Sequence, residues 1–162
     1  MSHGIRRILC CVGMKGDSDR VLHYAVKLVL ATGAELHVLH AVKSLSDDVL
    51  NTLKVNIRDR KVLGSLMEQR IERAESDLKS KLESFWTRHP DSSAALGDSP
   101  VGLTVLEGHP ASVIAHFATR SKSDMIVMAS NKRSSTMAYA GKVTKGVIKR
   151  AKVPVVVIPK NA

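Results

Sequence analysis

The sequence predicts a single-domain, doubly wound α/β protein, in which a parallel sheet carries helices on both faces. Strand-like apolar runs alternate with helical patterns along the chain, and such alternation produces parallel strands joined by right-handed crossovers. The length of 162 residues fits one domain with a substantial core. No apolar run approaches the roughly 20 residues of a membrane span. The first residues have the pattern of a strand and not that of a signal peptide. We therefore expect a cytoplasmic protein with no membrane segment.

The first three elements are a strand, a helix and a second strand. Residues 5–12 form a strand-like apolar run. The helical pattern that follows has Asp17 or Ser18 available to cap its first amides, and Gly33 ends it. Residues 34–42 read as the second strand. The alternation on which the fold prediction depends begins with this unit.

A long stretch without a strand pattern follows. Residues 44–56 form a polar connection that is irregular or contains a short helix. Residues 57–89 predict a long helix, in which Gly64 breaks or loosens the first part. Its apolar residues recur three and four positions apart on one face: Ile71, Ala74, Leu78, Leu82 and Phe85. Residues 89–100 are rich in turn formers and predict a simple connection.

Three strands and two helices complete the pattern. Residues 101–108 predict the third strand, and Pro110 stands where the first residue of the next helix should be. Residues 124–130 form a continuous apolar run suited to a strand buried on both faces. A helix over about 137–151 and a last strand within 153–159 follow. Ligands of such folds bind beyond the carboxyl ends of the strands, where the strand order reverses.

This rule points to the loops that follow Val12 and Met128. The second of these loops is polar, carries Lys132 and Arg133, and connects a strand to a helix. Many α/β proteins hold phosphate at such a loop, because the amides at a helix N-terminus attract anions. Phosphate loops are usually rich in glycine, however, and residues 130–140 contain none. The stretch therefore has the position of a phosphate site without most of its glycine chemistry.

The positive charge of the chain is concentrated in its last quarter. Residues 120–162 hold ten of the 25 Lys and Arg residues and one of the 15 Asp and Glu residues. Four lysines fall along one face of the last helix, namely Lys142, Lys145, Lys149 and Lys152. Its predicted apolar face consists of Val143, Val147, Ile148 and Ala151. The lysines form either a solvated face or a surface that attracts a nucleotide, nucleic acid or an acidic partner. Specific nucleic-acid binding is not expected, because the chain lacks interleaved aromatics and a recognised binding motif.

Several other residues suggest chemistry, but each has a structural interpretation. The adjacent Cys10 and Cys11 would point to opposite faces of a strand, which favours two buried thiols over a redox pair. His37 and His40 also point to opposite faces and cannot readily share a metal. His109 is expected to cap a helix. No catalytic arrangement of side chains stands out, so we expect no enzyme.

Three hydroxyl residues lie in the loop before the last helix. Ser134, Ser135 and Thr136 either cap that helix, with Thr136 best placed, or donate hydrogen bonds to an anion.

The order and spacing of three segments give the chain a family resemblance. They are "RRILCCVG…SDRVLHYAVKLVLATGAELHVLHAV", "VLEGHPASVIAHFA" and "SDMIVMAS…AGKVTKGVIKRAKVPVVVIP". Over essentially its full length the chain resembles the universal stress protein family. The resemblance implies a five-stranded parallel sheet in the order 3-2-1-4-5. It also implies a homodimer formed by antiparallel pairing of the last strands, here Val155, Val156, Val157 and Ile158.

One branch of this family binds ATP through a pattern of Gly, two residues, Gly, nine residues, Gly, and Ser or Thr. The corresponding positions here are Ala129, Lys132, Gly141 and Lys142, with only eight residues between the second and third. That branch also has an Asp at the end of its first strand, where this chain has Gly13. Other positions equivalent to the family's nucleotide pocket are Ala41 and Val143. Only Gly141 is kept among the diagnostic positions.

Two hypotheses follow from the resemblance. In the first, the chain is a non-catalytic, dimeric stress-response protein that binds protein partners and has little or no affinity for ATP. In the second, it is a nucleotide- or anion-binding module in which Lys132, Arg133 and Lys142 replace the lost glycine amides as a phosphate clamp. The sequence does not identify the stress, the partner or the ligand.

Overall fold

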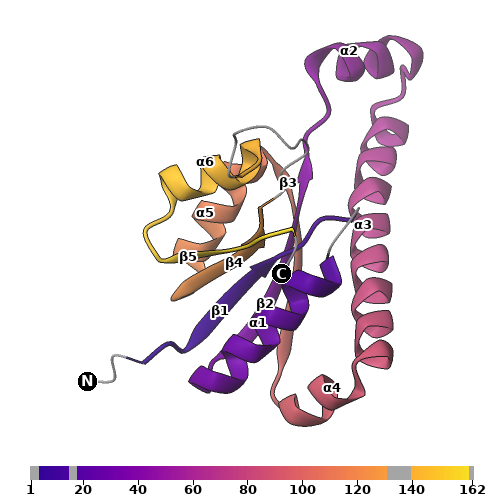
Figure 1. Cartoon of the computed structure of the whole chain (residues 1–162). Helices are drawn as coiled ribbons and strands as arrows, with labels where there is room; N and C mark the ends of the chain where they lie inside the picture. Colours follow the sequence, from indigo (N-terminus) through magenta and orange to yellow (C-terminus); the bar gives the residue numbers. More distant parts are fainter. Residues whose placement is uncertain (1–3, 15–17, 131–139, 161–162) are drawn as a thin grey trace.

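The sheet has five parallel strands in the order β3-β2-β1-β4-β5, which confirms the predicted order (Figure 1). The structure, a computed structural model, describes residues 4–14, 18–130 and 140–160. The strands are β1 (Arg7–Cys11), β2 (Glu35–Lys43), β3 (Val101–Gly108), β4 (Met125–Ala129) and β5 (Val155–Ile158). The strand order reverses between β1 and β4, because β1 pairs with β2 on one side and with β4 on the other.

Helices cover both faces of the sheet, as predicted. They are α1 (Ser18–Thr32), α2 (Asp47–Asn56), α3 (Arg60–Arg88), α4 (Pro90–Leu96), α5 (Pro110–Arg120) and α6 (Lys142–Arg150). Side chains of α1 and α3 share one hydrophobic core with the sheet, and side chains of α5 and α6 share the other. Figure 1 shows the two helix layers on opposite sides of the strands. The described helices include none that is long and apolar enough to cross a membrane.

The two cysteines separate into the two cores. Cys10 belongs to the core under α1 and α3, and Cys11 to the core under α5 and α6. Burial raises the pKa of the Cys10 thiol to about 12 and that of Cys11 well above its ordinary value. The prediction that they point to opposite faces is confirmed, and thiols in this state are poor nucleophiles.

The connection between β2 and β3 is more helical than predicted. The polar stretch after β2 contains α2, which is the short helix that the sequence left open. The long helix runs without a break through Gly64, so the predicted break there is wrong. Residues 89–100 contain α4 instead of a simple connection, because Pro90 is well suited to the first turn of a helix. The predicted apolar face of α3 is confirmed, with Leu78, Leu82 and Phe85 buried.

The last helix begins at Lys142, five residues later than predicted. Gly141 is its N-cap in an extended conformation, and the Gly141 N–H is bonded to the carbonyl of Ser130 instead of to an earlier helical turn. The predicted cap Thr136 lies outside the described residues. Ile148 is 40% exposed and does not belong to the buried face, which consists of Thr144 and Val147.

Candidate functional site

A pocket of about 200 Å³ lies at the carboxyl ends of β1, β2 and β4, where the strand order reverses. This is the position that the fold rule predicts. Its walls include Val12, Gly13, Ala41, Met128, Ala129 and Val143. The pocket therefore lies between the end of the sheet and the first turn of α6.

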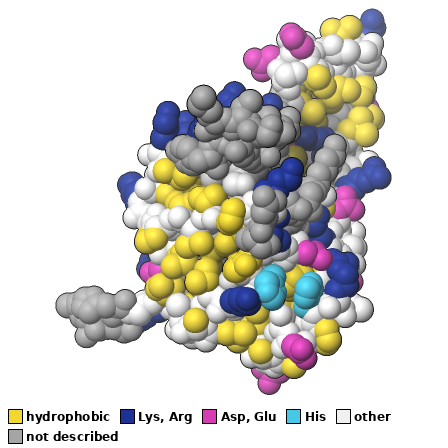
Figure 2. Space-filling view, in the orientation of Figure 1, with side chains coloured by type: hydrophobic (Ala, Val, Ile, Leu, Met, Phe, Trp, Pro, Cys, Tyr) yellow, Lys and Arg dark blue, Asp and Glu magenta, His cyan; other side chains and the backbone are white. Residues whose placement is uncertain are grey.

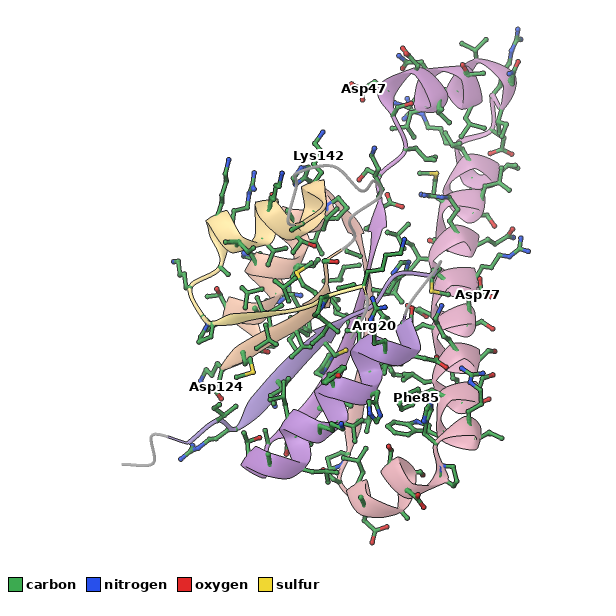
Figure 3. All side chains as sticks on the ribbon, in the orientation of Figure 1. Arg20, Asp47, Asp77, Phe85, Asp124 and Lys142 are labelled. Atoms are coloured by element: carbon green, nitrogen blue, oxygen red, sulfur yellow. The ribbon has the colours of Figure 1, made fainter. Side chains whose placement is uncertain are left out.

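The structure brings four of the predicted site residues to this pocket. Gly13, Ala41, Ala129 and Val143 all line it. Gly141 and Lys142 stand directly before Val143, at the N-terminus of α6, and do not line the pocket themselves. Figure 3 shows Lys142 at the start of α6. Lys132, Arg133 and the hydroxyl residues Ser134, Ser135 and Thr136 lie outside the described residues.

Two polar side chains in the pocket wall were missed as site residues. Ser18 Oγ donates to the carbonyl of Gly13 at 2.7 Å, and His40 Nδ1 lies 2.8 Å from the carbonyl of Val12. A carbonyl only accepts hydrogen bonds, so Nδ1 carries the proton in this contact. Their positions in the sequence could have identified them as site residues, because Ser18 begins α1 and His40 immediately precedes Ala41. Both side chains fix the loop after β1.

His37 and His109 have the structural roles predicted for them. His37 packs against Phe117 on the α5 side, with 5.1 Å between ring centroids, and its Nε2 lies 2.7 Å from Thr104 Oγ1. His37 and His40 therefore do not share a site. His109 is the N-cap of α5, where its Nδ1 accepts from the Ser112 amide. Among the described residues no group of three or more metal-ligating side chains comes together.

Three hydrogen bonds close the base of the loop after β4. Ser130 N–H donates to the carbonyl of Ile158 at 3.0 Å, and Gly141 N–H donates to the carbonyl of Ser130 at 2.5 Å. Thr144 Oγ1 donates to the carbonyl of Ala129 at 2.8 Å and is fully buried. The Gly141 amide is thus bonded to the protein itself and does not face a ligand.

The N-terminus of α6 contributes positive potential beside the pocket. No side chain of the described residues caps it, and the first amides of a helix have no partner within the helix. Lys142 and Lys149 are exposed on α6, and Lys152 is exposed just beyond its end. Figure 2 shows blue side chains along this edge of the molecule. The arrangement favours anions at the mouth of the pocket.

The chain belongs to the class of doubly wound α/β domains, and its pocket lies at the switch point where ligands of that class bind. Within that class, the family model described as the universal stress protein family matches residues 4–159. The chain belongs to this family.

Solved structures show the same fold at low sequence identity. Universal stress protein UspA from Lactobacillus plantarum is 19% identical with a TM-score of 0.69, covering 97% of this chain and 99% of that one. A universal stress protein in complex with cAMP is 16% identical with a TM-score of 0.58, covering 96% and 97%. The Archaeoglobus fulgidus protein in complex with dAMP is 18% identical with a TM-score of 0.52, covering 94% and 97%. No curated protein matches the chain.

The described residues fit a nucleotide poorly at the phosphate end. Gly13 offers no carboxylate, the methyl of Ala129 stands where the ATP-binding pattern has a glycine, and the Gly141 amide is already bonded. The pocket is also smaller than the roughly 300–1,000 Å³ common for ligand sites. The apolar walls can accept a small planar group, whereas phosphate would depend on the helix N-terminus and on lysines.

Proposed function

We propose that this chain is a cytoplasmic, non-catalytic stress-response protein that acts as a dimer through protein partners and binds ATP weakly or not at all. The observation that carries the proposal is the hydrogen bond between Gly141 N–H and the Ser130 carbonyl. It removes from the pocket the amide of the one diagnostic glycine that the chain retains. The polar pocket residues Ser18 and His40 are likewise held by backbone carbonyls, which favours a structural role over catalysis.

The nucleotide content of the purified protein tests this proposal. The protein is isolated without added nucleotide and denatured, and the released small molecules are analysed by mass spectrometry. We expect no stoichiometric adenine nucleotide and no binding heat when ATP with magnesium is titrated. Near-stoichiometric ATP, ADP or AMP in the released fraction would contradict the proposal.

The dimer is proposed to form through β5. This strand is at the edge of the sheet, and Val155, Val156 and Val157 are half-buried there. An apolar edge strand without a neighbour invites pairing with another chain. Val156 packs into the core, so Val157 is the better position for a test.

Val157→Lys is expected to convert the dimer to a monomer while the fold is retained. Leu103→Lys is the matched control, because Leu103 is an exposed apolar residue of β3 at the opposite edge of the sheet. Sedimentation equilibrium measures the mass of each variant. If Val157→Lys remains dimeric with native circular dichroism, the dimer forms elsewhere.

The second candidate function is binding of a nucleotide or another anion by a lysine clamp. The N-terminus of α6, which no described side chain caps, and the exposed Lys142 beside it favour this candidate. Two proteins of the same fold are in complex with cAMP and dAMP. Lys132 and Arg133 would complete the clamp. In this case Lys142→Glu should weaken binding of ATP at least tenfold, whereas Lys152→Glu beyond the far end of α6 should change it little. Equal affinities in both variants would eliminate the clamp.

A further inference from the structure

Two histidine rings meet where α1 packs against the junction of α3 and α4. The ring centroids of His23 on α1 and His89 lie 6.0 Å apart, and His89 is both the C-cap of α3 and the N-cap of α4. Both side chains are half-buried. Figure 2 shows histidine side chains side by side at the surface, next to a basic side chain. The two rings belong neither to the pocket wall nor to the β5 edge.

His89 connects this surface to the hydrophobic core. Its ring centroid lies 4.5 Å from that of Phe85, which is fully buried. Figure 3 shows Phe85 on the side of α3 that faces α1. The Phe85 ring in turn lies 5.1 Å from the ring of Trp86, the single tryptophan of the chain. A displacement of His89 would therefore open the edge of the core that α1 and α3 share.

The short helix α4 depends on its contacts with α1 and α3. It has seven residues, none of them buried, and no described side chain caps its N-terminus. A helix of this length is unstable on its own in water. Its position is therefore set by packing against the two longer helices, where His89 is the joint between α3 and α4.

The charged groups around the rings offer little compensation for an added positive charge. On α1, Asp19 lies one turn before His23, and the basic Lys27 lies one turn after it. The Asp19 carboxylate accepts hydrogen bonds from Arg88 of α3, at 2.9 Å from Nε and 2.5 Å from Nη2, so its charge is already balanced. α4 contributes one charged side chain, the exposed Asp91 in its first turn.

The surroundings of His23 favour the neutral form of its ring. Its Nδ1 is buried and has no hydrogen-bond partner among the described residues. An imidazolium carries an N–H on both nitrogens and would therefore bury one N–H without an acceptor. The ring of Tyr24, 5.6 Å away between centroids, carries no charge near neutral pH. Burial, and secondarily the charges of Lys27 and His89, lower the pKa of His23 below its ordinary 6.5.

We propose that the His23–His89 contact is an acid-sensitive latch, which holds α4 and the end of α3 against α1 near neutral pH and releases them in acid. Protonation places an imidazolium beside Lys27 and leaves its Nδ1–H without an acceptor, so the rings separate and become hydrated. The closed latch is thus fully stabilised above pH 6.5, and this stabilisation is lost as the pH falls through the lowered pKa of His23. Such a latch gives the chain a response to acid that is independent of the pocket and of the dimer.

Hydrogen exchange of the full chain, measured by mass spectrometry at about pH 7.5 and about pH 5, tests the latch. Protection factors, which are corrected for the effect of pH on intrinsic exchange, should fall about tenfold across residues 85–100, because one unit of pKa difference is a factor of about ten. Those of β1 and β4 should change less. The fluorescence of Trp86 reports the same opening. An equal fall in β1 and β4 would mean that acid weakens the whole domain and would overturn the proposal.

Lys27→Glu separates the effect of charge from the packing of the rings. Lys27 is exposed and lies one turn from His23, so a carboxylate at this position would balance an imidazolium while both rings stay in place. The acid-induced fall in protection should become several-fold smaller than in the native chain. Lys149→Glu, at an exposed position of α6, is the matched control and should behave like the native chain. An unchanged acid response in Lys27→Glu would overturn the proposal.

Removal of the two titratable rings tests which groups carry the response. His23→Gln with His89→Gln should show nearly equal protection across residues 85–100 at both pH values. His116→Gln is the control, because His116 is an exposed histidine of α5. A full acid response in the double variant would overturn the proposal. If the double variant is already open near neutral pH, Lys27→Glu decides between the two outcomes.

Discussion

Arg70 on α3 donates a hydrogen bond to the carboxylate of Glu107 at the end of β3, with 2.5 Å between Nη1 and Oε2. The same guanidinium donates through Nη2 to the carbonyl of Lys43 at the end of β2, at 3.2 Å. One side chain thus ties α3 to the ends of two adjacent strands. These contacts lie where residues 44–77, which contain α2 and the first part of α3, leave the body of the protein (Figure 1). We call this segment the arm, and Arg70 fixes the direction in which it projects.

Removing this guanidinium should loosen the arm more than it destabilises the domain. For Arg70→Met we expect faster hydrogen exchange across residues 44–77 and a loss of about 1 kcal/mol or less in the free energy of unfolding, because ion pairs about one-third exposed contribute little. Mass-spectrometric hydrogen exchange and urea unfolding measure the two quantities. The exposed neighbour Arg73→Met is the control. If hydrogen exchange across residues 44–77 is equally fast in the two variants, Arg70 does not anchor this segment.

Two helical glycines should respond to alanine in opposite directions. A methyl at Gly64 would meet nothing within 4 Å, so Gly64→Ala should stabilise α3 by about 0.5–1 kcal/mol through helix propensity. A methyl at Gly146 would lie 2.6 Å from Ala111 Cβ, where α6 packs closely on α5. Gly146→Ala should therefore cost about 1–3 kcal/mol despite the same propensity gain. Thermal unfolding compares the two variants, and a shift of the same sign in both would refute the packing argument.

Gly102 on β3 makes room for the ring of His37 on β2. A Cβ at this position would lie 2.3 Å from His37 Nδ1, and the ring is held by Thr104 and Phe117. Gly102→Ala should destabilise the protein by about 1–3 kcal/mol, because the ring must leave both partners. The double variant with His37→Ala should recover part of this loss. Additive losses in the double variant would mean that the two residues do not interact.

Acid should weaken the fold through His37. Burial, and secondarily the charge of Arg7, lower the pKa of His37 below its ordinary 6.5 in the folded state. The unfolded chain therefore binds the proton more readily, so this stabilising contribution is present above pH 6.5 and is lost as the pH falls through the folded pKa. His23 should affect stability in the same direction, since burial and the nearby Lys27 and His89 lower its pKa.

The check is unfolding free energy measured from about pH 7.5 to about pH 5. His37→Gln should show a shallower decline over this range than the native protein. A decline of equal steepness in the variant would assign the acid sensitivity to other groups.

The parallel sheet could be predicted because local sequence patterns indicate its strands and helices. The order of the strands was predicted from the family resemblance. The continuous apolar run of β4 and the apolar residues spaced three and four positions apart in α3 are visible in the sequence. The start of α6 could not be predicted, because it is fixed by a hydrogen bond between Gly141 and Ser130, eleven residues apart, and not by any local capping signal.

The candidate site was predictable in position and less so in detail. Gly13, Ala41, Ala129 and Val143 meet at the pocket because parallel strands end at one edge of the sheet. The roles of Ser18 and His40 depend on side chains reaching backbone carbonyls of a neighbouring loop. A linear sequence contains no signal for such contacts.

The closed base of the loop after β4 makes this site suitable for protein engineering. Ser130 and Gly141 are joined by their own hydrogen bond, and Ser130 is also tied to β5. The conformational cost of closing a loop rises only slowly with its length. A glycine-rich nucleotide-binding segment, or an unrelated peptide epitope, can therefore be grafted between these two residues while the sheet stays intact. The chain offers a scaffold in which ligand recognition can be exchanged as a cassette.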